Sequence, residues 1–260
     1  MGGLGSDMDF KELTELISSR CSGRDQVVIA MSGGVDSSLV AAASHKALGG
    51  RLVAVTVHSE LTANRDFTRA VEVAEHIGIE HHPLLVRVLD DSGVRRNAED
   101  RCYHCKKNIF AMMVLEYGDD TLIIDGTNAD DDPARPGLRA VREYGVFSPL
   151  AEAGIGKAKV RELARTIGLP NWDTPSESCL ATRIPVGIEL DQDNLNKVQV
   201  METFFHKQGV STLRARHDNL VATVEYLPQF TEIMNKNRDK FAALVEKIGL
   251  RSYIFKEWSE

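Results

Sequence analysis

The amino-acid sequence predicts an α/β protein, a doubly wound parallel sheet followed by a small C-terminal α+β domain. In the first half, short apolar runs alternate with segments of helical spacing, a pattern typical of βαβ units. Right-handed crossovers make a sheet with helices on both faces the simplest topology. After a stretch rich in Pro, Ser and Thr at 172–185, the pattern changes. We therefore place two domains at 1–183 and 184–260.

The expected elements of the first domain follow from apolar runs and stop signals. Apolar β-branched runs are typical of strands buried on both faces, and a glycine follows each expected helix. The strands are expected at Val27–Met31, Arg51–His58, Pro83–Leu89 and Thr121–Asp125, and the helices at Leu39–Leu48, Asp66–Ile77, Cys105–Tyr117 and Lys157–Ile167. In the second domain, we expect helices at Asn194–Gln208 and Thr231–Lys247, and strands at Thr212–Arg216, Val221–Tyr226 and Ser252–Lys256.

The composition is that of an ordinary soluble globular protein, with 43% hydrophobic and 27% charged residues among 260. It excludes a disordered chain, a collagen-like fibre and a disulfide-rich miniprotein. No apolar stretch of about 18 residues is present, and residues 1–9 do not resemble a secretory signal. We therefore expect a cytoplasmic protein without a membrane partner. The net charge of −7 argues against a nucleic-acid partner.

A phosphate-binding loop is predicted at Ser32–Ser38, between the first strand and the first helix. Glycine lets the backbone approach an anion, and a helix start offers N–H groups that lack a helical partner. The loop is neither a Walker loop nor a G-x-G-x-x-G loop. Asp36 would repel a phosphate unless Mg²⁺ lay between them. The alternative is a simple tight turn, with Asp36 as an acid at a helix start.

Cys102 and Cys105 precede a predicted helix in a Cys-x-x-Cys spacing, and Cys179 lies far along the chain. Neighbouring cations and a helix start are expected to lower a thiol pKa. Three interpretations remain open: a structural zinc site, a transient disulfide, or an iron–sulfur cluster held by three thiolates. A further alternative gives the Cys102–Cys105 pair and Cys179 unrelated roles. Cys21 is interpreted as a bystander.

The loop Ser-Gly-Gly-Val-Asp-Ser resembles the PP-loop of the ATP pyrophosphatases, which include GMP synthetase, NAD synthetase and tRNA thiolation enzymes. The chain as a whole is similar to the LarE family of ATP-dependent sulfur transferases. The resemblance implies a PP-loop (adenine nucleotide alpha hydrolase-like) fold. The matching strings are SGGVDS at Ser32–Ser37, RCYHCKK at Arg101–Lys107, DGTNADD at Asp125–Asp131, a long string at Ser148–Gly187, and LRARHDNLVATVE at Leu213–Glu225.

The resemblance implies that ATP and Mg²⁺ adenylylate the carboxylates of pyridinium-3,5-biscarboxylic acid mononucleotide, which then become thiocarboxylates. The product belongs to the biosynthesis of the nickel-pincer nucleotide, the cofactor of lactate racemase. In one branch of the family, the cysteine matching Cys179 gives up its own sulfur. In the other branch, three cysteines hold a [4Fe–4S] cluster that carries the sulfide. Cysteines stand at all three positions here, which indicates the cluster branch. Family members also assemble, so a homo-oligomer is expected.

The resemblance also assigns site residues. Cys102, Cys105 and Cys179 would ligate the cluster, and Glu202 and Glu225 resemble active-site acids that bind metal or orient substrate. Arg214 and Arg216 alternate along a strand, so that both point to one face and suit the phosphate of the mononucleotide; the alternative is a solvated strand face. The residues expected to bind nucleotide or substrate phosphate are Ser32, Gly33, Gly34, Asp36 (near Mg²⁺), Ser37, Ser38, Gly126, Thr127, Asn128 and Arg183.

Other functions compete with this one. A tRNA thiolation enzyme also combines a PP-loop with Cys-x-x-Cys, but it needs a basic RNA surface. An ammonia-using synthetase would leave the cysteines unexplained. A non-catalytic ATP or redox sensor would release no pyrophosphate when the dicarboxylate is added.

Overall fold

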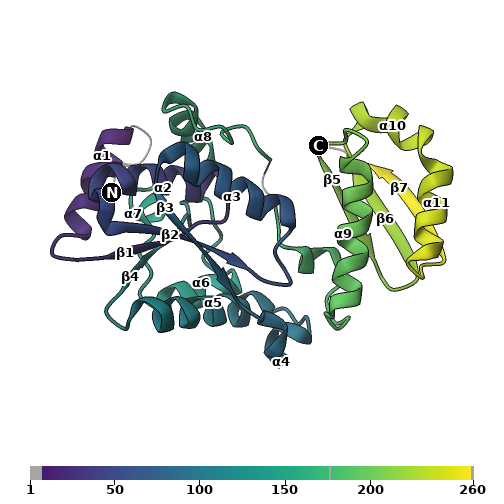
Figure 1. The fold of residues 1–260 in the computed structure, drawn as a ribbon, viewed down its shortest axis with the longest axis horizontal. Helices are drawn as coiled ribbons and strands as arrows, with labels where there is room; N and C mark the ends of the chain where they lie inside the picture. The colour runs from purple at the N-terminus through teal and green to yellow at the C-terminus, as the bar shows by residue number, and fades with distance from the viewer. Residues whose placement is uncertain (1–7, 176, 259–260) are drawn as a thin grey trace. The chain divides into compact units, whose positions relative to one another are not determined.

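The computed structural model describes residues 8–175 and 177–258 of the chain. These fold into two compact units (Figure 1). The first unit consists of Met1–Val88 and Cys102–Glu177, and the second of Leu89–Arg101 and Ser178–Glu260. The domain boundary expected after Arg183 lies a few residues beyond Glu177.

The first unit contains a parallel sheet with strand order β3-β2-β1-β4. Its central strand β1 pairs in parallel with both β2 and β4, as expected of successive right-handed crossovers. The α/β fold class is therefore confirmed. The strands are β1 Val27–Ala30, β2 Leu52–His58, β3 Glu80–Leu85 and β4 Leu122–Ile124.

Helices cover both faces of this sheet because successive side chains of β1 point in opposite directions. Val27 and Ile29 pack with α1, α2, α3 and α8, whereas Val28 packs with α5 and α6 (Figure 1). The helices are α1 Phe10–Arg20, α2 Val35–Leu48, α3 Asn64–Ile77, α5 Arg101–Tyr117, α6 Pro136–Glu143, the short α7 Pro149–Glu152 and α8 Lys157–Thr166.

The third strand does not occupy the predicted range. The sequence predicts it at Pro83–Leu89, but β3 begins at Glu80 and pairs with β2 from Val53↔Glu80 to His58↔Leu85. Val88–Asp90 forms a 3₁₀ turn instead. An edge strand is covered less completely than a central one, so its polar residues are tolerated and its apolar pattern is weak. The prediction was wrong because it treated this strand as buried on both faces.

The second unit contains a sheet of order β5-β6-β7, in which β6 runs antiparallel to β5 and parallel to β7. Phe205 and Phe241 pack from α9 and α11 onto Phe255 of β7. The elements are α4 Ser92–Arg95, α9 Gln192–His206, β5 Leu213–His217, β6 Val221–Tyr226, α10 Thr231–Lys236, α11 Arg238–Lys247 and β7 Ser252–Glu257.

The single helix predicted at Thr231–Lys247 is two helices. Asn237 separates α10 from α11, with backbone angles of φ −103° and ψ 9°. Its side chain donates to the carbonyl oxygen of Ile233 at 2.9 Å. Asparagine competes in this way with the backbone ladder of a helix, which explains the break.

The segment Leu89–Arg101 belongs to the second unit because Asn97 fastens it there. The Asn97 side chain is fully buried and donates to the carbonyl oxygens of Pro185 at 2.9 Å and Ile188 at 3.0 Å. A buried amide that satisfies several carbonyls fixes two distant stretches of chain together.

Among the described residues, no helix is both long enough and apolar enough to cross a bilayer.

We predict that acid destabilises the second unit through His217. This side chain is 2% exposed, its Nε2 lies 2.9 Å from the carbonyl oxygen of Asn194, and its Nδ1 accepts from the amide of Asn219 at 3.2 Å. Burial lowers its pKa from the ordinary 6.5, so the unfolded chain binds more protons than the folded one. The contribution to stability is complete above 6.5 and is lost as pH falls toward the lower folded pKa.

The measurement is urea unfolding at about pH 7.5 and about pH 5. The His217→Gln variant should lose less stability than the native protein over this interval. His76→Gln, at an exposed position on α3, is the control and should keep the native dependence. Equal slopes for the native protein and His217→Gln would contradict the prediction.

Candidate active site

The phosphate loop, residues 32–38, joins β1 to α2 and closes on itself. Ser37 Oγ accepts from the amide of Ser32 at 3.2 Å and donates to the carbonyl oxygen of Gly34 at 3.0 Å. Gly34 is the N-cap of α2, and within the described chain no side chain caps this helix. The N–H groups of the first turn and the positive end of the helix dipole are therefore available to an anion.

Gly33 is the position in this loop that requires glycine. Its φ of 78° lies in the left-handed region. A Cβ there would lie 2.7 Å from the carbonyl oxygen of Asp66 and 2.9 Å from the amide nitrogen of Ala70, both on α3. The loop therefore rests directly on the backbone of α3.

The three serines of the loop occupy different environments. Ser32 is exposed, whereas Ser37 and Ser38 are 4% and 0% exposed. Ser38 donates its hydroxyl to the carbonyl oxygen of Gly34 at 2.9 Å. Of the three hydroxyls expected to contact phosphate, that of Ser32 faces solvent and the other two shape the loop.

The carboxylate of Asp36 is paired with a cation. Lys157, the first residue of α8, makes an ion pair with Asp36 Oδ2, and Asn128 donates to Oδ1 at 3.2 Å. The amide of Lys157 in turn donates to Asp130 at 2.6 Å. A negative charge inside an anion-binding loop is thus offset by a neighbouring lysine.

The end of β4 lies against the start of α2. A Cβ on Gly126 would lie 2.6 Å from the amide nitrogen of Ser37, so only glycine permits this approach. The preceding Asp125 is buried and accepts from Ser148 Oγ at 2.6 Å and Thr127 Oγ1 at 2.7 Å. These bonds turn the chain sharply after the strand and place Gly126 on the loop.

The Cys-x-x-Cys pair occupies the first turn of α5 in the first unit. Cys102 and Cys105, three residues apart, lie on one side of the helix and are half-buried. Lys106, the next residue, places its Nζ 3.5 Å from Asp125 Oδ2 at the end of β4. The first unit therefore brings the cysteine turn and the phosphate loop to the same end of its sheet.

A cation and a hydrogen bond from α6 hold the cysteine turn. Tyr103 donates its hydroxyl to Glu143 at 2.9 Å, and the guanidinium of Arg139 lies 3.8 Å from the centre of the Tyr103 ring. Hydrogen bonds from Arg139 and then Tyr103 lower the pKa of Glu143. Cys21 has a different setting: it is fully buried, and burial raises the pKa of its thiol.

In the second unit, Cys179 stands at the start of a 3₁₀ turn, Leu180–Arg183, and is exposed. Arg183 ends this turn, is 1% exposed, and donates Nε to Glu202 Oε1 on α9 at 2.9 Å. The same oxygen accepts from the amide of Ala215 at 3.1 Å. Glu202 is buried rather than solvated, and it holds the turn after Cys179 against α9 and β5.

The predicted arginine pair lies on one face of β5. Arg214 and Arg216 alternate with buried residues, and both face Glu225 of β6. Arg216 donates Nε to Glu225 at 3.0 Å and another N–H to the carbonyl oxygen of Thr182. The guanidinium of Arg214 lies 4.6 Å from the centre of the Trp258 ring. The second unit thus gathers Arg183, Glu202, Arg216 and Glu225 beside the Cys179 turn.

No group of three or more His, Cys, Asp or Glu side chains among the described residues is arranged to hold a metal ion. Cys102 and Cys105 belong to the first unit and Cys179 to the second.

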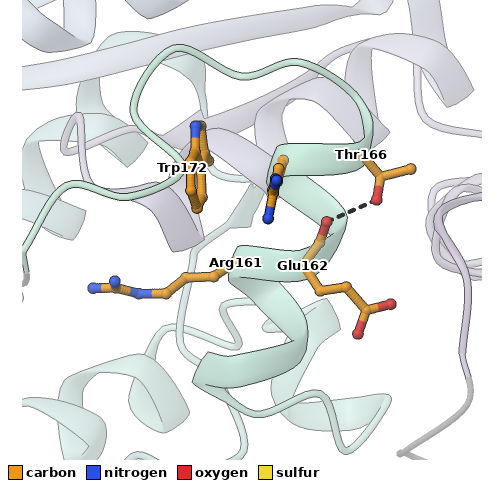
Figure 2. A pocket seen from close by; sticks show the side chains of 5 residues that line it. Arg161, Glu162, Thr166 and Trp172 are labelled. Atoms are coloured by element: carbon orange, nitrogen blue, oxygen red, sulfur yellow. Dashed lines mark hydrogen bonds between the residues drawn. The ribbon is translucent and has the colours of Figure 1, made fainter.

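A cavity of about 530 Å³ lies outside all of these positions, between α8 and the segment that follows it (Figure 2). It is lined by Arg161, Glu162, Arg165, Thr166 and Trp172.

The parallel sheet and its phosphate loop define a PP-loop ATP pyrophosphatase domain. The asparagine synthase family model matches residues 11–110, which include that loop. A glutamine-hydrolysing GMP synthase chain of Archaeoglobus fulgidus is 29% identical and covers 62% of this chain and 55% of its own length.

Two relatives extend the match across both units. A pyridinium-3,5-bisthiocarboxylic acid mononucleotide synthase of Lactiplantibacillus plantarum is 33% identical over 78% of this chain and 75% of its own. An uncharacterised protein of Synechocystis sp. is 36% identical over 79% and 78%. The chain therefore belongs to the LarE family of ATP-dependent sulfur transferases.

Two residues beside the phosphate loop were missed by sequence reasoning. Lys157 pairs with Asp36 from 121 residues away, and Asn171 donates to the loop from a segment after α8. The only signal for Lys157 was a lysine at a helix start, where a cation opposes the helix dipole and needs a partner. Asn171 lay in a stretch interpreted as a linker.

We predict that Gly126→Ala lowers both stability and ATP affinity. The added Cβ must displace the backbone at Ser37, so the free energy of unfolding should fall by about 1–3 kcal/mol. Gly50→Ala, at a glycine where an added Cβ would meet nothing within 4 Å, is the control and should change stability by less than about 0.5 kcal/mol. Denaturant unfolding and ATP titration provide the measurements. Equal effects of the two substitutions would count against a tight approach of β4 to the loop.

We also predict that removing one partner of the Arg183–Glu202 pair costs more than removing both. The pair is buried, so Glu202→Leu leaves an uncompensated charge and should destabilise the protein by about 3–5 kcal/mol. The double variant Arg183→Met/Glu202→Leu should recover part of that loss. Unfolding of the single and double variants forms a double-mutant cycle. Additive losses would show that the two side chains do not interact.

Proposed function

We propose that the protein adenylylates the carboxylates of pyridinium-3,5-biscarboxylic acid mononucleotide with ATP and converts them to thiocarboxylates. The product would be a precursor of the nickel-pincer nucleotide of lactate racemase. The observation that carries this proposal is the match across both units to a synthase named for the bisthiocarboxylic product. We place the reaction in the cytoplasm, where thiols stay reduced.

ATP activates a substrate that otherwise resists attack. A carboxylate oxygen is a poor leaving group, so the carboxylate first attacks the α-phosphorus of ATP and pyrophosphate leaves. The N–H groups at the start of α2 would hold the phosphates, with Ser32 adding its exposed hydroxyl. The acyl adenylate then loses AMP when sulfur attacks its carbon.

Mg²⁺ fits the donor set of this loop. Magnesium takes oxygen ligands, commonly one or two carboxylates together with substrate phosphates and water. Asp36 supplies a carboxylate at the start of α2, where the phosphates would bind. When bound, the ion would neutralise phosphate charge during attack at phosphorus. Lys157 already pairs with Asp36, so we propose that it also contributes positive charge there.

The substrate would be held by the arginines of the second unit. A mononucleotide carries a phosphate, and guanidinium groups bind phosphate oxygens in pairs. Arg214 and Arg216 share one face of β5, and Glu225 orients Arg216. We propose that these arginines bind the substrate phosphate. Arg183 is buried against Glu202, so we assign it to positioning the Cys179 turn.

The donor chemistry fits an iron–sulfur cluster. Cys102 and Cys105 share one side of a helix turn, and Cys179 is an exposed thiol. Within the second unit, Arg101 donates to the carbonyl oxygen of Ala181 at 3.3 Å. The residue before Cys102 is thus tied to the residue two after Cys179. We propose that the three cysteines hold a [4Fe–4S] cluster, which supplies a site for exchangeable sulfide when bound.

A second candidate source of sulfur is Cys179 itself, because it is the exposed cysteine of the three. Sacrifice of its sulfur would lower the mass of the chain by about 34 Da, the mass of H₂S. Intact mass before and after turnover separates the two sources. A cluster source leaves the mass unchanged.

We predict that the anaerobically purified protein releases pyrophosphate from ATP when the dicarboxylate mononucleotide is added. A coupled pyrophosphate assay provides the measurement, and the same mixture without the mononucleotide is its control. Release at the same rate in both would contradict substrate adenylylation. ADP and phosphate as products would contradict attack at the α-phosphorus.

We predict that Cys179→Ala abolishes sulfur transfer and leaves pyrophosphate release intact, because the thiol acts after adenylylation. Cys21→Ala is the matched control, since Cys21 is buried away from solvent in the first unit. It should keep both activities. Loss of pyrophosphate release in Cys179→Ala would indicate that Cys179 supports the adenylylation site instead.

A further inference from the structure

Asn171 reaches the phosphate loop from outside it. The side chain is 3% exposed and lies in the segment 169–174, which follows α8. Its Nδ2 donates to the carbonyl oxygen of Gly33 at 2.9 Å and to Ser38 Oγ at 2.9 Å. Both N–H groups of one buried amide are thus used on the loop.

The chemistry of the partners fixes the orientation of this amide. The carbonyl oxygen of Gly33 can only accept, so the nitrogen of Asn171 must face it. Ser38 gives its one hydroxyl hydrogen to Gly34, so it accepts from Asn171. The Oδ1 atom of Asn171 is buried and has no partner among the described residues. Because an apolar side chain would avoid that cost, the amide serves its two donors.

The bond to Gly33 aims the next N–H group. The carbonyl of Gly33 and the N–H of Gly34 belong to one planar trans peptide and point in opposite directions. Asn171 holds the carbonyl on the buried side. The N–H of Gly34 consequently points toward Ser32 Oγ, 3.4 Å away, and Ser32 is exposed. Nearby, the backbone of α3 limits Gly33, as its close contacts show.

The segment that carries Asn171 is itself held by α8. The amide of Leu169 donates to Ala164 at 2.9 Å, and Arg161 donates to the carbonyl oxygen of Thr174 at 3.2 Å. Trp172, the next residue after Asn171, stands beside α8 with the guanidinium of Arg165 5.0 Å from its ring (Figure 2). These contacts anchor the segment on both sides of Asn171.

We propose that Asn171 is a positioning residue of the ATP site. It sets the peptide between Gly33 and Gly34 so that the N–H of Gly34 faces the ATP phosphates. This inference rests on the proposed use of ATP by the loop, and it adds a residue that does not itself touch the nucleotide.

The test compares Asn171→Ala with Asn237→Ala. Asn237 is 5% exposed, lies in the second unit and donates to one carbonyl at 2.9 Å, so its loss should lower stability without affecting ATP. With Mg²⁺ present, Asn171→Ala should bind ATP about tenfold more weakly by calorimetry. Asn237→Ala should bind it as the native protein does. Circular dichroism first establishes that each variant is folded.

Asn171→Ser keeps the experiment decisive if the alanine variant does not fold. Its side chain ends one atom earlier and cannot reach both partners, so ATP binding should again weaken several-fold. Native affinity in a folded Asn171 variant would overturn the proposal. So would an equal loss of affinity in Asn237→Ala, which would indicate general destabilisation.

ATP binding is measured without the mononucleotide, so this test separates the inference from the proposed function. If Asn171→Ala weakens ATP binding but the native protein releases no pyrophosphate with the dicarboxylate, the function fails and the inference stands. If ATP binding is unaffected while pyrophosphate is released, the inference fails and the function stands.

Discussion

The site depends on placing a carboxylate inside a loop built to bind an anion. The start of α2 offers N–H groups and a positive dipole end, and Asp36 stands in the same turn. Lys157 offsets this negative charge, and Asn128 fixes the carboxylate from the end of β4. The loop, the strand end and the start of α8 therefore form one charge-balanced unit. A Mg²⁺–phosphate ligand would add positive and negative charge to it together.

The second unit solves a different problem, the burial of charge beside a reactive thiol. Glu202 accepts from both Arg183 and the backbone of Ala215, so neither buried charge lacks a partner. That pair fixes the turn after Cys179. Arg216 is tied to Glu225 and to the same turn, while Arg214 rests on Trp258. The arginines are thereby preorganised on one face of β5, which favours a phosphate ligand.

Much of this fold could be predicted from local patterns. Val27–Ala30 and Leu52–His58 read clearly as buried strands, because both of their faces are covered by helices. The edge strand β3 and the break at Asn237 could not be read, since edge pairing and side-chain competition depend on neighbours in space. The loop Ser32–Ser38 was recognisable from its glycines and its position. Lys157 and Asn171 were not, because their roles arise only when α8 packs against α2.

The most direct test of adenylylation follows oxygen atoms from substrate to AMP. The dicarboxylate mononucleotide is labelled with ¹⁸O in its carboxylates, and the AMP formed with unlabelled ATP is analysed by mass spectrometry. If the carboxylate attacks the α-phosphorus, expulsion of AMP by sulfur leaves a carboxylate oxygen on its phosphate, so the AMP carries the label. Unlabelled AMP formed in step with the thiocarboxylate would contradict the account.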